Sequence, residues 1–249
     1  MYKKTIIAFT TFLLALAFNF STKAKGPSHE MWDRLLKKHV TADGKVDYKG
    51  FIKDSVEFNK YLKLLSENSP DEKTWSSNEQ KAFWINAYNA FTVKLITRYY
   101  PIKSIKDIGS KIQIPFVNTP WDVKFIEIGN EKMDLNNIEH GKLRNQFNDP
   151  RIHFAIVCAS KSCPVLLNEA YDAARIDMQL DTQARAFLKD TTRNKITADK
   201  PEISKIFEWY KKDFTKKESL IDFLNHYAPV KIKQDAKIDH IHYNWDLNE

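Results

Sequence analysis

The stretch from Glu79 to Tyr100, EQKAFWINAYNAFTVKLITRYY, most constrains what this chain can fold into. Its apolar residues recur at helical spacing and extend nearly all the way round the helix, and Pro101 ends it. A helix that is apolar on almost every side is buried inside a protein and does not lie at its surface. The sequence therefore predicts a long buried helix over this stretch.

A second apolar run, RIHFAIVCA at residues 151–159, is typical of a central strand that is covered on both faces. It follows a predicted helix for which Asp134 is the N-cap. Two shorter extended segments, VKFIEI and KMDL, flank a turn at Gly129 and Asn130. Further helices are expected over roughly 173–189 and near the C-terminus. The predicted fold class is α+β: a mixed, helix-rich, single compact domain with central buried strands against packed helices.

Residues 1–24 have the features of a secretory signal peptide. Lys3 and Lys4 precede an apolar stretch from Ile6 to Phe20, and small residues before Ala24 suit cleavage there. This stretch is short against the roughly 20 apolar residues that span a bilayer. We therefore expect a periplasmic or secreted product with no membrane span after cleavage. Residues 25–75 are then an N-terminal helical lead-in to a main domain over residues 76–249.

The charge of the chain argues against a nucleic-acid partner. Removal of Lys3, Lys4 and Lys23 with the signal peptide would lower the formal net charge from +7 to +4. Charges of both signs are spread along the chain, without the long basic block that binds a polyanion. The sequence identifies no substrate and no protein partner. A chain of this length buries a sizeable core without cross-links, so the cysteines are not needed for folding alone.

Cys158 and Cys163, the only cysteines, lie in the segment HFAIVCASKSCP at residues 153–164. Cys158 ends the predicted strand, where it resembles a small core hydrophobe. Cys163 follows a polar turn and precedes Pro164, a residue favoured at the first position of a helix. A thiol near a helix N-terminus, with Lys161 close by, is in a setting that favours the thiolate. Of the two, Cys163 is therefore the expected nucleophile.

Three other interpretations of the cysteine pair stay open. A Cys158–Cys163 disulfide suits an exported protein, although so short a loop would stabilise the fold by only about 2 kcal/mol. A labile disulfide would give the pair a redox role. A zinc site would need four ligands, and no second cluster of cysteine and histidine is present. We therefore expect no metal. The sequence also has no glycine-rich phosphate loop, so we expect no cofactor.

Two histidines and a glutamate are candidates for acid–base chemistry. Glu139 and His140 are adjacent in the helix after Asp134, and His140 shares a helix face with Arg144. His153 would point away from Cys158 if both lay on one strand, because side chains alternate along a strand. It could still serve a site through another element, or be a core histidine with its hydrogen bonds satisfied.

Asn86 is a candidate for orienting a catalytic imidazole or for donating to an oxyanion. It lies three residues before Asn89 on one face of the predicted buried helix. A buried amide without hydrogen bonds costs about 1–3 kcal/mol. The alternative is that both asparagines tie the helix to the backbone of nearby loops.

Several segments together resemble the domain of unknown function 547 (DUF547) family. They are FWINAYNAFTV, IEHGKLR, DPRIHFAIVCASKSCPVL, SKIFEWYKKDF and the closing YNWDLN, and the match runs in order through almost the whole mature chain. The resemblance implies that the SCP turn and the Glu139–His140 pair belong to one compact domain. It implies no substrate.

The leading functional hypothesis is a thiol-dependent hydrolase or acyltransferase with the logic of papain or transglutaminases. Cys163 would be the nucleophile and His140 or His153 the base, oriented by Glu139 or Asn86. The alternatives are a non-enzymatic exported binding or structural domain with a Cys158–Cys163 disulfide, and a thiol–disulfide redox protein.

Overall fold

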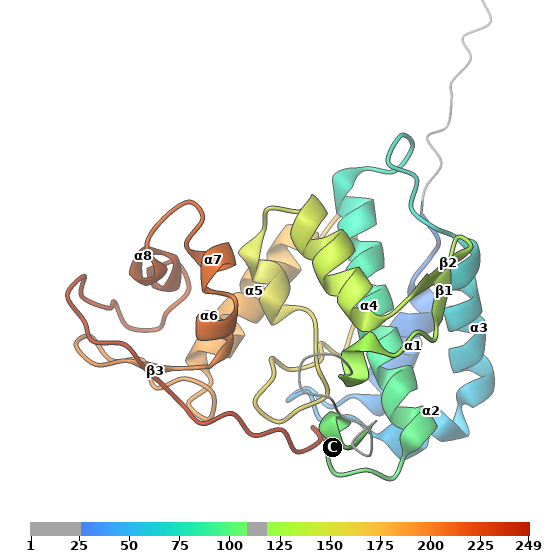
Figure 1. The fold of residues 1–249 in the computed structure, drawn as a ribbon, viewed down its shortest axis with the longest axis horizontal. Coiled ribbons are helices and arrows are strands. Elements are labelled where there is room, and N and C mark those ends of the chain that lie inside the picture. Colours follow the sequence, from blue (N-terminus) through green and yellow to red (C-terminus); the bar gives the residue numbers. More distant parts are fainter. Residues whose placement is uncertain (1–25, 109–118) are drawn as a thin grey trace, which may run out of the picture.

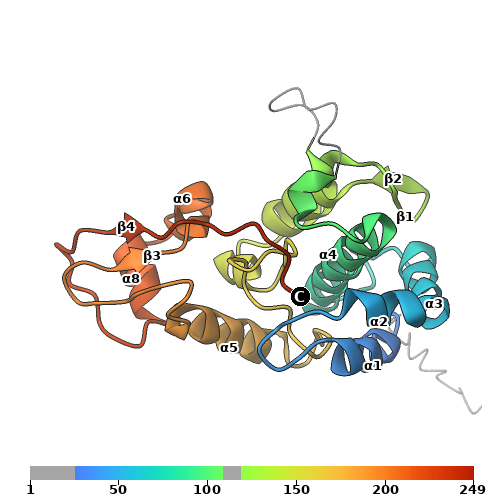
Figure 2. The same ribbon diagram turned by 90° about the horizontal axis from the view of Figure 1, so that it is seen from below.

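The computed structural model describes residues 26–108 and 119–249, so the predicted signal peptide lies outside the described residues. Within them the chain forms two lobes, which occupy the two ends of Figure 1 and are seen from below in Figure 2. The first lobe contains α1 (Glu30–His39), α2 (Tyr48–Lys53), α3 (Ser55–Glu67), α4 (Ser77–Tyr99), η1 (Ile105–Asp107), η3 (Pro120–Asp122), β1 (Ile126–Ile128) and β2 (Glu131–Met133).

The second lobe follows two short helices at the junction. The junction holds the π-helix η4 (Asn137–Arg144) and the 3₁₀ helix η5 (Pro150–Phe154). The second lobe contains α5 (Ile176–Lys189), β3 (Glu202–Ile203), α6 (Ile206–Trp209), α7 (Lys211–Phe214), α8 (Leu220–Asn225) and β4 (Asp239–His240). The described residues are thus helix-rich with a small amount of strand, which is compatible with the predicted α+β class.

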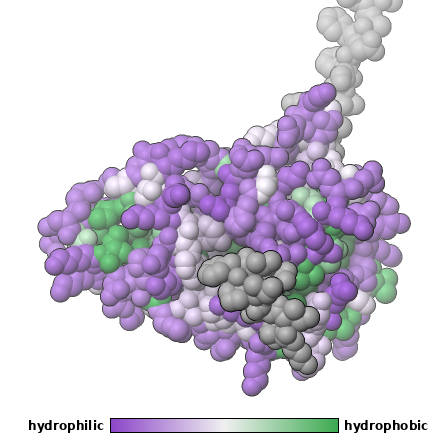
Figure 3. Space-filling view, in the orientation of Figure 1, coloured by the Kyte–Doolittle hydropathy of each residue, from purple (hydrophilic) through white to green (hydrophobic). Residues whose placement is uncertain are grey.

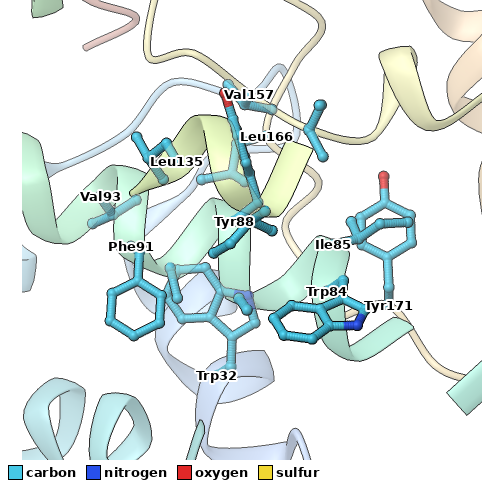
Figure 4. Packing of buried hydrophobic residues seen from close by; sticks show 14 of the residues in the cluster. Trp32, Trp84, Ile85, Tyr88, Phe91, Val93, Leu135, Val157, Leu166 and Tyr171 are labelled. Carbon is cyan, nitrogen blue, oxygen red and sulfur yellow. The ribbon is translucent and has the colours of Figure 1, made fainter. Parts of the chain in front are cut away.

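Helix α4 is the buried helix that the sequence predicts. It begins with a capping box, in which the Ser76 side chain accepts from the Glu79 N–H and the Glu79 carboxylate accepts from the Ser76 N–H. Every residue from 82 to 93 is buried. Figure 4 shows side chains of α4, Tyr88 among them, in one cluster with Trp32 of α1 and Leu135. The first lobe is therefore built round α4.

The turn at Gly129 and Asn130 joins β1 and β2 as an antiparallel hairpin, as predicted. Both turn residues have a positive φ, of 59° and 68°, which glycine and asparagine tolerate best. Ile126 pairs with Met133 in this hairpin. Both are buried, so the hairpin adds one apolar face to the first lobe.

The predicted central strand at residues 151–159 is wrong. Its first part is the 3₁₀ helix η5, and the rest is irregular. The buried backbone here is paired with the side chain of Asn89, which donates to the Ala155 carbonyl and accepts from the Val157 N–H, both at 2.9 Å. An amide from α4 therefore satisfies polar groups that a neighbouring strand would otherwise satisfy. The apolar run reflected burial and not strand geometry.

The C-terminal segment returns from the second lobe to the first, as Figures 1 and 2 both show. Leu247 forms an isolated antiparallel β-bridge with Ser160, and the Asn248 N–H donates to the Ala159 carbonyl at 3.2 Å. The Tyr48 hydroxyl donates to the side chain of Asn248 at 2.6 Å. These bonds lay the end of the chain across the cysteine-containing loop.

The surface seen in Figure 3 is largely hydrophilic, with an apolar area on the second lobe. Among the residues described, no helix has both the length and the apolar character that crossing a membrane requires.

Candidate functional site

A cavity of about 290 Å³ lies where the two lobes meet. Cys158 packs against the apolar clusters of both lobes, and so does Trp245. One group of lining residues carries reactive or titratable side chains: Glu139, His153, Cys158 and Cys163. A second group is aromatic: Tyr88, Trp121, Trp209, Tyr210, Tyr243 and Trp245. Four of the five predicted catalytic or cysteine positions outside α4 thus converge on one cavity, while His140 does not line it.

Both cysteines are free thiols, and their Sγ atoms lie 3.0 Å apart, within hydrogen-bonding distance. No disulfide joins them. Cys158 is half-buried, whereas Cys163 is only 4% exposed. The Cys158 sulfur also lies 3.3 Å from the hydroxyl groups of both Ser160 and Tyr243. Cys158 is therefore the more accessible thiol, with three hydrogen-bonding groups around its sulfur.

These contacts separate the pKa values of the two thiols. The hydrogen bond from Cys163 is the main cause that lowers the pKa of Cys158 to about 7, and those from Ser160 and Tyr243 act in the same direction against burial. Burial, together with the neighbouring Cys158, raises the pKa of Cys163 well above its usual value. The backbone N–H of Cys158 donates to Cys163 Sγ at 3.0 Å and opposes this rise only in part, so Cys158 has the lower pKa of the two thiols.

The features that favoured Cys163 in the sequence are not present. No helix begins at Pro164, so Cys163 has no helix N-terminus beside it. Lys161 forms an ion pair with Asp246 at 3.4 Å instead. The expectation that Cys158 is a core hydrophobe at a strand end is corrected in the same way, because that strand does not exist and Cys158 lines the cavity.

The loop that carries Cys158 is held in an unusual backbone conformation. Ala159 has a φ of +59°, in the left-handed region that residues with a side chain seldom adopt. Asn89 fixes the backbone just before it, and Asn248 bonds the carbonyl of Ala159 itself. Such conformations persist where the surroundings determine them, often at functional sites. Here the conformation brings Cys158 and Ser160 together beneath Tyr243.

His153 contributes an imidazole to the cavity wall. It is 4% exposed, stacks on Tyr210 with ring centroids 4.0 Å apart, and places Nε2 2.7 Å from Oδ2 of Asp213. Arg144 donates to the same carboxylate through Nε at 2.6 Å and Nη2 at 3.1 Å. Burial alone would raise the pKa of Asp213, but the bonds from His153 and Arg144 hold it well below its usual range. A carboxylate that is ionised at neutral pH thus orients the imidazole.

Glu139 enters the cavity wall from the π-helix η4. The helix that Asp134 caps is confirmed, with the Asn137 N–H donating to the Asp134 carboxylate at 2.7 Å. The wider π-turns were not expected, and such turns occur frequently at functional sites. Glu139 is 4% exposed, and its Oε2 accepts from the Tyr88 hydroxyl at 3.3 Å.

The chain matches one protein-family model over part of its length. Residues 72–188 match the family model described as "Protein of unknown function, DUF547". This part of the chain is similar to that family and is called the DUF547 segment below. No curated protein and no solved structure was found to match the chain. The predicted resemblance is thus confirmed over residues 72–188, and it brings no activity with it.

The DUF547 segment supplies Glu139, His153 and both cysteines, whereas Asp213, Tyr243 and Trp245 lie beyond it. Sequence reasoning missed Asp213 as the partner of His153. The segments that resemble the family do include YKKDF and YNWDLN, and this was the only signal for these positions. Nothing in their local pattern connects them with a histidine or cysteine far away in the sequence.

Two predicted residues of the DUF547 segment lie outside the cavity. Asn86 donates to the carbonyl of Tyr171 at 2.8 Å and accepts from its N–H at 3.0 Å, so its amide ties α4 to a loop. His140 is exposed, and its Nδ1 lies 2.8 Å from Nη1 of Arg144. The shared face of His140 and Arg144 is thus confirmed, and the Nδ1 atom of His140 also lies 3.9 Å from Oε1 of Glu139. No set of three or more acidic, cysteine or histidine side chains in the described part of the chain is placed to hold a metal ion.

Proposed function

We propose that the cavity is the active site of a thiol-dependent hydrolase or acyltransferase in which Cys158 is the nucleophile. The observation that carries the proposal is the set of hydrogen-bonding groups round the Cys158 sulfur, namely Cys163, Ser160 and Tyr243, on the wall of a cavity. They favour a thiolate near neutral pH, and the thiolate is the reactive form of cysteine. The likeness to papain or transglutaminases is one of chemical logic and is part of the proposal.

In this reaction the Cys158 thiolate attacks the carbonyl carbon of an ester or amide. The acyl group forms a thioester with Sγ, and the leaving oxygen or nitrogen takes a proton from an acid in the cavity. Water or an amine then attacks the thioester carbonyl, gives its proton to the same group and restores the thiolate. We assign the role of acid and base to His153, because it lines the cavity and Asp213 binds its Nε2, which leaves Nδ1 for proton transfer. In this proposal His153 takes the role of base, and Asp213 orients it.

A second candidate function, thiol–disulfide exchange, is favoured by the 3.0 Å separation of the two sulfur atoms and their opposite pKa shifts. Cys158 would attack a substrate disulfide and form a mixed disulfide. Cys163 would then lose its proton and attack Sγ of Cys158, which releases the substrate as a dithiol and leaves a Cys158–Cys163 disulfide. A dithiol reductant would have to restore the pair.

Two substitutions distinguish these functions. We would measure the activity of the unmodified protein and of the Cys158→Ala and Cys163→Ser variants. The substrates are p-nitrophenyl esters, aminoacyl p-nitroanilides and a protein that contains a disulfide. The hydrolase proposal expects Cys158→Ala to lose at least 100-fold in kcat/KM, whereas Cys163→Ser keeps most of the activity because serine still donates to the thiolate. Loss of disulfide reduction in both variants, without any acyl-enzyme, would support the exchange reaction. Activity that survives in Cys158→Ala would overturn Cys158 as the nucleophile, and no activity in any assay would leave the non-enzymatic binding role.

We further propose that this chemistry takes place outside the cytoplasmic membrane. The lysines and apolar stretch of residues 1–24 support export, as the sequence predicts. N-terminal sequencing of the protein from fractionated cells tests it. A mature chain beginning at Lys25 in the exported fraction agrees, and an intact Met1 in the cytoplasm contradicts it.

A further inference from the structure

Glu139 is a buried carboxylate with few partners. It lines the cavity, and its Oε2 accepts a hydrogen bond from Tyr88 at 3.3 Å. The hydroxyl of Tyr210 also interacts with this carboxylate, whereas Oε1 is buried without a geometric hydrogen-bond partner among the described residues. An ionised carboxylate loses its hydration when it is buried, and several hydrogen-bond donors are normally needed to compensate for that loss. Unsatisfied buried polar atoms are few in folded proteins, and a missing ligand is one reason for them.

The cations near Glu139 are already committed elsewhere. Arg144 uses Nε and Nη2 on Asp213, and its Nη1 bonds Nδ1 of His140. His140 Nδ1 lies 3.9 Å from Glu139 Oε1, but it accepts the hydrogen of Arg144 and therefore cannot donate to the glutamate. No lysine or arginine is among the described residues that line the cavity. The cavity thus presents an acidic group that lacks a cationic partner of its own.

Aromatic residues that line the same cavity as this carboxylate suit an organic cation. Trp121 and Trp209 contribute large aromatic surfaces, and aromatic rings attract a nearby cation through their electron-rich faces. The volume of about 290 Å³ is at the lower end of the roughly 300–1,000 Å³ of ligand pockets. The cavity therefore has room for a small head group or one side chain of a larger molecule.

We propose that the substrates of this cavity carry a primary ammonium group, which donates to the carboxylate of Glu139 where its side chain lines the cavity, while the attached carbon atoms pack against the tryptophan side chains. A primary ammonium has both the charge and the hydrogens that this carboxylate lacks, whereas a hydroxyl has no charge and a quaternary ammonium has no hydrogens. The inference rests on the proposed function only in calling the ligand a substrate.

The test compares two probes that differ in charge but hardly in shape, para-fluorobenzylammonium and para-fluorobenzyl alcohol. Their binding to the Cys158→Ala protein is followed by fluorine NMR and by tryptophan fluorescence. This variant removes the second anionic group of the cavity, so any preference for the cation is attributable to Glu139. We expect the ammonium to bind at least tenfold more tightly than the alcohol, and this ratio to fall to within about twofold when Glu139→Gln is added.

Glu127→Gln is the matched control, because Glu127 is exposed on β1 and should leave the ratio unchanged. If Glu139→Gln does not fold, a second measurement on the unmodified protein still tests the inference. In it, the ammonium should protect Cys158 from alkylation by iodoacetamide at a tenfold lower concentration than the alcohol. Equal binding of the probes, no binding of either, or a preference that survives in Glu139→Gln would overturn the inference. Binding is measured in a variant without Cys158, so a negative result for the ammonium does not bear on Cys158 as the nucleophile. Conversely, a lack of catalytic activity does not bear on the binding of the ammonium.

Discussion

His153 and Asp213, 60 residues apart in the sequence, bring Nε2 and Oδ2 within 2.7 Å of each other. The pairing joins η5 at the junction to α7 in the second lobe, and Arg144 of η4 binds the same carboxylate. One ionised side chain therefore holds together the elements that form the cavity wall.

Asp213→Asn should destabilise the protein at neutral pH but much less in acid. The pKa of Asp213 is lowered in the folded state by His153 and Arg144, so its contribution is fully present above the unfolded value of about 3.9 and is lost as the pH falls through the folded value. We expect a loss of about 1–3 kcal/mol at pH 7, measured by urea unfolding, and a smaller difference at pH 3. Asp199→Asn, which removes an exposed ion pair with Lys233, should cost less than about 1 kcal/mol. A difference for Asp213→Asn that grows toward acid would contradict the role given to this carboxylate.

Alkylation by iodoacetamide should single out Cys158, with a half-point near pH 7. Cys163 should react far more slowly because burial both shields it and raises its pKa. The hydrogen bond from Cys163 is the main cause of the low value, so Cys163→Ala should raise the half-point of Cys158 and Cys163→Ser should raise it less. Mass-resolved labelling between pH 5 and 9 measures both sites at once. Preferential labelling of Cys163 would restore it as the nucleophile.

Tyr243→Phe should also raise the alkylation half-point of Cys158, but by less than Cys163→Ala. The lost hydroxyl lies 3.3 Å from the Cys158 sulfur and is a smaller cause of its lowered pKa than Cys163. Tyr227→Phe serves as the control, because its hydroxyl bonds Asp181 away from the cavity. The same pH series of alkylation rates compares the variants. An unchanged half-point in Tyr243→Phe would remove the C-terminal segment from the thiol chemistry.

The sequence allowed the prediction of elements whose signals are local. Helix α4 followed from its apolar residues and Pro101, and the hairpin followed from Gly129 and Asn130. The same kind of signal misled at residues 151–159, because an apolar run records burial and says nothing about which groups satisfy the backbone. The partner there is Asn89, more than sixty residues earlier.

The sequence predicted which residues belong to the candidate site better than it predicted how they are arranged. The predicted Glu139, His153, Cys158 and Cys163 do line one cavity. The choice between the two thiols depended on a strand and a helix N-terminus that the structure lacks. Asp213 and Tyr243 come to the site through long-range folding, which spacing along the chain does not encode.

Asn89 and Asn86 offer a matched pair that separates structure from thiol chemistry. Each buried amide makes two hydrogen bonds to backbone, Asn89 to Ala155 and Val157 and Asn86 to Tyr171. Replacing either with alanine leaves a buried carbonyl and a buried N–H unpaired, so we expect each variant to lose about 2–4 kcal/mol of unfolding free energy in urea. Only Asn89 holds the backbone that leads into Cys158, so only Asn89→Ala should change the pH dependence of Cys158 alkylation. Equal changes in both variants would show that general loosening of α4 is responsible, and no change in either would show that Asn89 does not position the thiol.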